Sequence, residues 1–111
     1  MDDLIIVKAE LDEYEDICKI INDIILELFP HYIRSDGKES TLRIPDEKIK
    51  SDIESSFLYK IVMKGKNELI GTVSIIDNEI DSMYLVPFYQ KRGYGRHVLS
   101  LVEVEKTKYA N

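Results

Sequence analysis

Residues 80–96 constrain the fold of this chain more than any other stretch. Residues 80–86 alternate and contain β-branched and aromatic types, which is typical of a strand, and Pro87 ends it. A basic turn with Gly93 and Gly95 follows, and after Arg96 the apolar residues recur with helical spacing. Such a turn gathers free backbone N–H groups at a helix N-terminus, and glycines allow positive φ and close approach of a ligand. The sequence therefore predicts a phosphate-binding turn.

Positive charge gathers in this turn although the chain as a whole is acidic. Lys91, Arg92 and Arg96 stand here in a chain with a formal net charge of −6. Cations at a helix N-terminus are unfavourable without an anion, so their position favours ligand contact over a solvated helix start. The pI near 4.9 argues against nucleic acid as the main partner, since phosphate neutralisation requires a broad basic face. An acidic surface instead favours a cationic small molecule or a lysine-bearing acceptor.

Length and cysteine content narrow the class of protein further. With 111 residues, the chain is expected to form one domain. No apolar run approaches the ~20 residues of a membrane helix, and Asp2 and Asp3 stand where a signal peptide would be basic. We therefore expect no membrane partner. The single cysteine, Cys18, is expected to be a small buried side chain, and its solitary state suits a reducing cytoplasm.

The remaining sequence predicts an α+β fold with a mainly antiparallel sheet. Hydrophobic spacing and turn residues indicate a helix from about Asp12 that Pro30 ends, and a second helix from Pro45. Between them, residues 31–43 are expected to form an irregular connection. Strands are expected at four places: 4–9, 57–63, 68–76 and 79–86. With the final helix, the element order becomes β-α-α-β-β-β-α.

The glycine turn resembles the signature of a known superfamily. Gln90-Lys91-Arg92-Gly93-Tyr94-Gly95 is similar to Gln/Arg-x-x-Gly-x-Gly/Ala, the motif of the GNAT superfamily of acetyl-CoA-dependent N-acetyltransferases. Rossmann and Walker A patterns do not fit, because a third glycine and a Gly-Lys-Ser/Thr are missing. The resemblance implies a GNAT-like fold over residues 1–111 that lacks the usual C-terminal strands and helix.

The resemblance also implies a function and a cofactor site. The implied reaction transfers acetyl from acetyl-CoA to an amine of a small molecule or protein; the alternative is a shortened, non-catalytic module that binds CoA or a protein partner. Main-chain groups of Met83, Tyr84 and Leu85 would pair with the pantetheine arm as an added strand. The pyrophosphate would lie on the turn, formed by Gln90, Lys91, Arg92, Gly93, Tyr94, Gly95 and Arg96.

The resemblance also bears on the catalytic base and on the oligomeric state. Such a transfer needs a base for the ammonium. Some members of the GNAT superfamily place a carboxylate base near the start of the fourth strand, so the resemblance implies Glu79, with Asp81 two residues on and on the same face of a regular strand. Both also fit ordinary solvent-side positions. No metal is expected. Because the family's next strand is not encoded, the edge of strand 79–86 is expected to be bare, which invites a homodimer through that edge.

Overall fold

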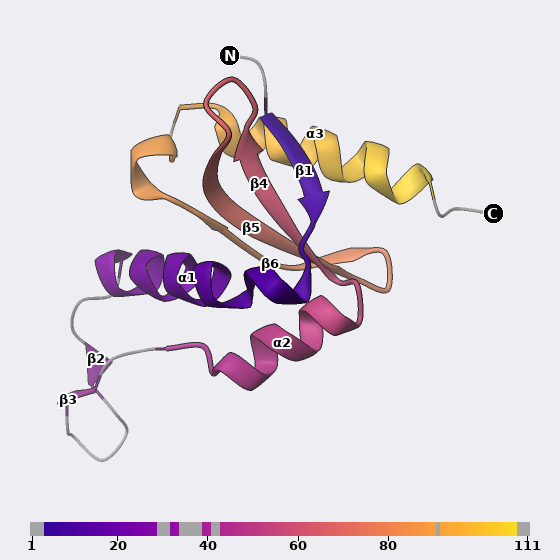
Figure 1. Ribbon diagram of the computed structural model, residues 1–111. Coiled ribbons are helices and arrows are strands. Elements are labelled where there is room, and N and C mark those ends of the chain that lie inside the picture. The colour runs from indigo at the N-terminus through magenta and orange to yellow at the C-terminus, as the bar shows by residue number, and fades with distance from the viewer. Residues whose placement is uncertain (1–3, 29–31, 34–38, 41–42, 91, 109–111) are drawn as a thin grey trace.

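The computed structural model describes residues 4–28, 32–33, 39–40, 43–90 and 92–108. Its main sheet has four antiparallel strands in the order β1–β4–β5–β6. These strands are β1 (Leu4–Lys8), β4 (Leu58–Met63), β5 (Glu68–Ile76) and β6 (Glu79–Leu85). The helices are α1 (Tyr14–Leu28), α2 (Asp46–Glu54) and α3 (Tyr94–Thr107). The predicted α+β fold with an antiparallel sheet is confirmed (Figure 1).

The sheet lies between two layers of helix, and each face has its own apolar core. On one face, α3 places Val98 and Val102 against the sheet, in a cluster completed by Leu4, Tyr59, Ile61, Ile70, Val73, Leu85 and Tyr89. On the other face, α1 and α2 pack on Leu58 through isoleucines at helical spacing, namely Ile17, Ile21, Ile25, Ile49 and Ile53. Figure 1 shows this arrangement, with α3 at one end of the view and α1 and α2 at the other.

The ends of several elements differ from the prediction. A 3₁₀ turn, Leu11–Glu13, precedes α1, and the Glu13 carboxylate accepts the N–H of Glu10 at 3.0 Å, so α1 begins at Tyr14 rather than at Asp12. The last helix begins at Tyr94 and not after Arg96, because Gly93 caps it in the left-handed conformation. Pro30, expected to end the first helix, lies outside the described residues.

The connection between the first two helices is not wholly irregular, contrary to expectation. β2 (Tyr32–Ile33) and β3 (Glu39–Ser40) form a small antiparallel pair within residues 31–43. Each strand is only two residues long, so neither shows the alternation that identifies a strand in a sequence. No helix in the described part of the chain is long and apolar enough to cross a membrane.

β6 lies at one edge of the main sheet and contains an irregularity. Ser74 is opposite Ser82, but the next residue, Ile75, is opposite Ile80, so Asp81 has no partner on β5. One extra residue in one strand is a β-bulge, which bends the strand and re-aims its side chains. The outer edge of β6 has no partner strand among the described residues.

Candidate functional site

The segment that joins β6 to α3 is held firmly against the sheet. Val86 donates its N–H to the carbonyl of Ile70 at 2.8 Å, and a 3₁₀ turn, Pro87–Tyr89, follows. Gln90 then donates its side-chain amide to the carbonyl of Leu85 at 2.8 Å. The predicted ligand residue Gln90 thus has a structural partner, which fixes the start of the glycine turn.

Aromatic packing also stabilises the segment that joins β6 to α3. The buried ring of Tyr89 meets the ring of Tyr94 edge to face, with centroids 5.2 Å apart. Tyr94 is also the first residue of α3. The N-terminus of α3 is therefore fixed relative to the end of β6, which is what a preorganised ligand site requires.

The two glycines of the turn have different conformations. Gly93 has φ of 85° and caps α3 in the left-handed region, where residues with a Cβ are strained. Gly95 lies inside α3, so the positive φ that the sequence permits at both glycines occurs at Gly93 alone. A Cβ on Gly95 would meet only Met83 Cε, at 3.9 Å, among the described residues. The described structure therefore gives no steric reason for glycine at position 95.

The start of α3 differs in charge from the starts of the other helices. α1 and α2 have two acidic residues each in the first turn, whereas α3 has none. Arg96 is exposed in this turn, and the exposed Arg92 places its guanidinium 4.4 Å from the centroid of the Phe88 ring. Lys91, the third predicted cation, lies outside the described residues. The N-terminal end of α3 therefore combines helix-dipole and side-chain positive charge.

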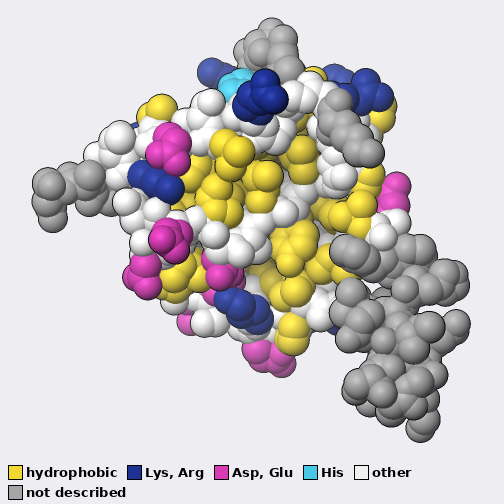
Figure 2. All heavy atoms as spheres, turned by 180° about the vertical axis from the view of Figure 1, so that it is seen from behind, with side chains coloured by type: hydrophobic (Ala, Val, Ile, Leu, Met, Phe, Trp, Pro, Cys, Tyr) yellow, Lys and Arg dark blue, Asp and Glu magenta, His cyan; other side chains and the backbone are white. Residues whose placement is uncertain are grey.

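The three residues at the end of β6 that are predicted to pair with the pantetheine arm differ in solvent exposure. Met83 is exposed, Tyr84 is half-buried and Leu85 is buried. Figure 2 shows the face on this side of the molecule, where apolar side chains gather across the middle and charged ones lie around them. An open strand edge beside an apolar surface suits an extended arm with amide groups.

Gly71 on β5 lets β6 approach closely at this point. Gly71 is opposite Leu85, and a Cβ there would lie 2.1 Å from the carbonyl oxygen of Tyr84. That separation is far inside van der Waals contact, so the close fit of β5 and β6 requires glycine. Gly71 was expected only as a strand residue, and its role depends on strand pairing that a single sequence does not show.

Asp81 lines a pocket between the sheet and the first two helices. The pocket has a volume of about 250 Å³ and apolar walls formed by Ile21, Ile44, Ile49 and Leu58. Its polar groups come from α2, from the inner strand β5 and from the edge strand β6: Lys48, Asp52, Ser74, Asp81, Ser82 and Tyr84. Glu79 is exposed at the start of β6 and does not line it. The expected pairing of Glu79 and Asp81 rests on regular alternation, which the bulge at Asp81 interrupts.

Two hydrogen-bonded pairs and two shifted pKa values describe the polar side of this pocket. Lys48 donates to both carboxylate oxygens of the buried Asp52, at 2.8 and 2.9 Å, and this hydrogen bonding raises the pKa of Lys48. Ser82 donates its hydroxyl to Ser74 at 3.1 Å. Burial, and to a lesser degree the charge of Asp81, raises the pKa of Tyr84, so its phenol stays protonated.

Lys48 and Asp52 are pocket residues that sequence reasoning missed. Their i, i+4 spacing on a short helix reads as an ordinary surface ion pair. The only sequence signal is the position of Asp52 directly before Ile53 on the apolar side of α2, which predicts partial burial of the carboxylate. Their place beside β6 follows from the packing of α2 on the sheet.

The segment after the β2–β3 pair is anchored to α1 by one side chain. Asn22 accepts the N–H of Ile44 at 2.8 Å and donates to the carbonyl of Ile44 at 3.3 Å. The same amide donates to the carbonyl of Cys18 at 2.9 Å. These bonds hold Ile44 in place as a wall of the pocket.

Two other features of the described structure do not contribute chemistry here. Cys18 is buried, as expected, and burial together with Asp46 raises the pKa of its thiol, so a nucleophilic thiolate is disfavoured. Among the residues the structure describes, no group of three or more His, Cys, Asp or Glu side chains is placed to hold a metal ion.

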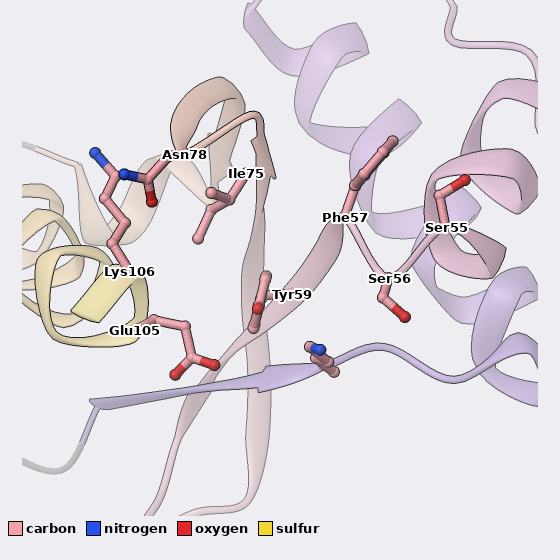
Figure 3. Close-up of a pocket in the computed structure, with 9 residues that line it drawn as sticks. Ser55, Ser56, Phe57, Tyr59, Ile75, Asn78, Glu105 and Lys106 are labelled. Atoms are coloured by element: carbon pink, nitrogen blue, oxygen red, sulfur yellow. The ribbon is translucent and has the colours of Figure 1, made fainter. Parts of the chain in front are cut away.

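A second pocket, of about 210 Å³, lies at the other end of α3 (Figure 3). Tyr59 and Ile75 form its apolar part, and Glu105 and Lys106 face it from α3. Both charges already have partners on the helix, since Glu105 pairs with Lys108 at 3.0 Å and Lys106 with Glu103 at 3.2 Å. This pocket is about three helical turns from the glycine turn, so we regard it as separate from the site.

Comparison with known proteins places this geometry in a family. The family model described as Acetyltransferase (GNAT) family matches residues 19–109. The fold is similar to that of PaiA N-acetyltransferase from Thermoplasma acidophilum, solved in complex with coenzyme A, with 20% identity and a TM-score of 0.64 over 97% of this chain and 74% of that chain. No curated protein sequence matches the chain.

Two further structures share the fold at lower coverage of their own length. One is an acetyltransferase (GNAT family) from Bacillus anthracis, with 17% identity and a TM-score of 0.58 over 90% of this chain and 60% of that chain. The other is the loading GNATL domain of CurA from Lyngbya majuscula, with 10% identity and a TM-score of 0.62 over 91% and 57%. The chain thus spans about three fifths of either. On the family model and the shared fold, the chain belongs to the acetyltransferase (GNAT) family.

Proposed function

We propose that this chain binds acetyl-CoA along β6 and at the start of α3, and transfers the acetyl group to an amine. The observation that carries the proposal is Gly95, a glycine inside a helix that no described neighbour requires. Gly95 is the second residue of α3, and alanine is a better helix former than glycine, so a glycine there calls for another reason. Close approach of a pyrophosphate to the backbone supplies one.

The charges and the strand edge support the same cofactor. Arg92 and Arg96 stand beside a helix N-terminus that has no acidic residue in its first turn, and both would make charge-assisted contacts to phosphate. The open edge at Met83–Leu85 offers main-chain groups to the amides of a pantetheine arm. Similarity to PaiA, whose structure contains coenzyme A, adds support.

Asp81 and Tyr84 are the side chains we assign to the chemistry. In the proposed reaction, the neutral amine attacks the carbonyl carbon of the acetyl-CoA thioester, so that a carbon–nitrogen bond forms and the carbon–sulfur bond breaks. Coenzyme A leaves as a thiolate and takes up the proton that the attacking nitrogen loses. Asp81 accepts the proton that the ammonium must lose, and the protonated phenol of Tyr84 is a pocket hydroxyl on β6 that can donate to developing negative charge. Glu79, exposed and outside the pocket, is assigned at most a relay to solvent.

A binding module without turnover is the second candidate. The chain spans only 60% and 57% of two of the structures it resembles. The alternative is therefore a module that binds coenzyme A or a protein partner without turnover. The predicted homodimer would use the same open edge of β6 as the pantetheine arm, so strand pairing and cofactor binding compete. Measurement of mass in solution with and without acetyl-CoA tests this: a dimer that dissociates on cofactor addition is expected, and a monomer in both states removes the dimer.

Two assays test the proposed function in sequence. Thermal shift with acetyl-CoA is expected to show saturable stabilisation, and no shift at about 1 mM contradicts both the enzyme and the module that binds coenzyme A. Thiol release over a panel of amines then separates them, since turnover supports the enzyme and binding without turnover supports the module. Cytoplasmic location, expected from the lone cysteine, also remains a prediction.

A further inference from the structure

We infer that the pocket of Asp81 selects a small amine with a single positive charge and an apolar body. This substrate class rests on the proposed function and deepens it. The argument uses the balance of charges in the pocket, the nature of its walls and its volume.

The pocket has one carboxylate in excess. Asp52 is buried and accepts both of its short hydrogen bonds from Lys48, so their charges neutralise each other. Asp81 is exposed at the pocket, and its carboxylate has no hydrogen bond or ion pair with any residue in the described part of the chain. Counted by formal charge, Lys48, Asp52 and Asp81 give the pocket a net charge of −1, which one ammonium group balances.

The hydrogen-bonding groups near Asp81 leave a defined place for that ammonium. Ser82 and Ser74 use one hydroxyl hydrogen between them, so oxygen lone pairs remain free to accept. Tyr84 from the same strand also lines the pocket. An ammonium has three donors and no acceptor, which matches a carboxylate flanked by hydroxyl oxygens.

The other side of the pocket is apolar, so the amine that binds there needs an apolar group to contact it. Ile21 and Ile49, both buried, face it from α1 and α2, and Leu58 faces it from β4. A cavity of about 150 Å³ binds a benzene ring, so about 250 Å³ accommodates a ring or branched group with a short arm. A thin linear chain leaves part of this volume unfilled and loses dispersion contacts.

The same features disfavour other amine classes. A polyamine brings a second cation, but the second carboxylate is already held by Lys48. An amino acid brings a carboxylate into a pocket that already has an excess negative charge. A protein lysine has a linear stem that contacts only part of the isoleucine and leucine wall. A small arylalkyl or branched alkyl monoamine satisfies all three conditions.

Direct binding of amines tests the inference independently of turnover. The probe is 2-phenylethylamine, titrated calorimetrically into the full chain with and without saturating coenzyme A. The comparison ligands are 2-phenylethanol, spermidine and Nα-acetyl-lysine methylamide. We expect the probe to bind at least tenfold more tightly than each comparison ligand in at least one of the two states.

Matched variants locate the binding. Asp81→Asn is expected to weaken the probe about tenfold, because a hydrogen-bonded charge partner is lost. Glu54→Gln, which removes an exposed carboxylate of α2 outside the pocket, is expected to leave binding unchanged. Ser82→Val fills the pocket and is expected to weaken 2-phenylethylamine more than ethylamine. Circular dichroism checks that each variant is folded.

The outcomes separate this inference from the proposed function. Selective probe binding that Asp81→Asn removes supports the inference even if acetyl-CoA does not bind. Acetyl-CoA binding or turnover without selectivity for the probe, or with spermidine or the lysine compound preferred, overturns the inference and leaves the proposed function standing. If neither ligand binds, both are overturned.

Discussion

Gly71→Ala offers a sharp test of how β5 and β6 are joined. The added methyl carbon would lie 2.1 Å from the carbonyl oxygen of Tyr84, 3.0 Å from Leu85 Cα and 3.1 Å from the carbonyl carbon of Tyr84. All three atoms are backbone, so no side chain can rotate away. Because ordinary contact begins near 3.4 Å, the end of β6 must move by about 1 Å.

The cost of Gly71→Ala follows from that movement. Overpacking typically costs about 1–3 kcal/mol, and each ladder hydrogen bond weakened adds about 0.5–1.5 kcal/mol. We expect the free energy of unfolding to fall by about 3 kcal/mol, and the melting temperature by about 12 °C for a domain of this size. Urea denaturation followed by circular dichroism measures the first, and a thermal melt measures the second.

Gly95→Ala is the matched control, since it adds the same methyl group next to the same strand. There the new carbon would meet only Met83 Cε, at 3.9 Å, and it would sit in a helix that alanine favours. We expect its stability to be unchanged or raised by up to about 1 kcal/mol. If Gly71→Ala lies within about 0.5 kcal/mol of the parent chain, the close approach of β6 to β5 described above is wrong.

Three further substitutions test other parts of the account. Gly93→Ala is expected to cost about 1–2 kcal/mol, because φ of 85° strains an L-residue, and an unchanged urea midpoint would argue against the left-handed cap. Lys60 donates a hydrogen bond to the Glu13 carboxylate and lowers the pKa of Glu13 below its ordinary value of 4.5. The Glu13 carboxylate therefore adds stability above pH 4.5, and this stability is lost as pH falls through the lower folded-state pKa. Lys60→Met should therefore make stability less dependent on pH below about 5; an identical acid profile would contradict the pairing. Asn22→Ala leaves the N–H of Ile44 without its acceptor and is expected to cost about 2–3 kcal/mol in urea denaturation, whereas a loss below about 0.5 kcal/mol would show that the anchor contributes little.

Local sequence patterns were sufficient to predict the helices and strands that surround the site. The strands predicted at 57–63 and 68–76 and the glycine turn before α3 each depend on neighbours in the chain, and the structure confirms them, with β4 beginning at Leu58. Cys18 was predicted to be buried for the same reason, since it lies beside the apolar stripe of α1.

Features that arise from pairing between distant segments could not be predicted in this way. The bulge at Asp81 exists because the register between β5 and β6 changes after Ser74, and nothing in residues 79–85 alone indicates a change. Likewise, the pocket joins Lys48 on α2 to Asp81 on β6, and only the packing of both helices on the sheet brings them together. The residues of the proposed cofactor site form one contiguous stretch, whereas those of the proposed acceptor pocket come from segments far apart in the sequence.

Calorimetric titration of acetyl-CoA into the parent chain and into Gly95→Ala tests the central claim most directly. The account predicts saturable binding of one acetyl-CoA per chain in the micromolar range for the parent chain. It also predicts at least tenfold weaker binding by a Gly95→Ala protein that is fully folded, because a methyl group then stands where the pyrophosphate approaches the helix. Equal affinity for the two proteins, or no binding to the parent chain at about 1 mM, would contradict it.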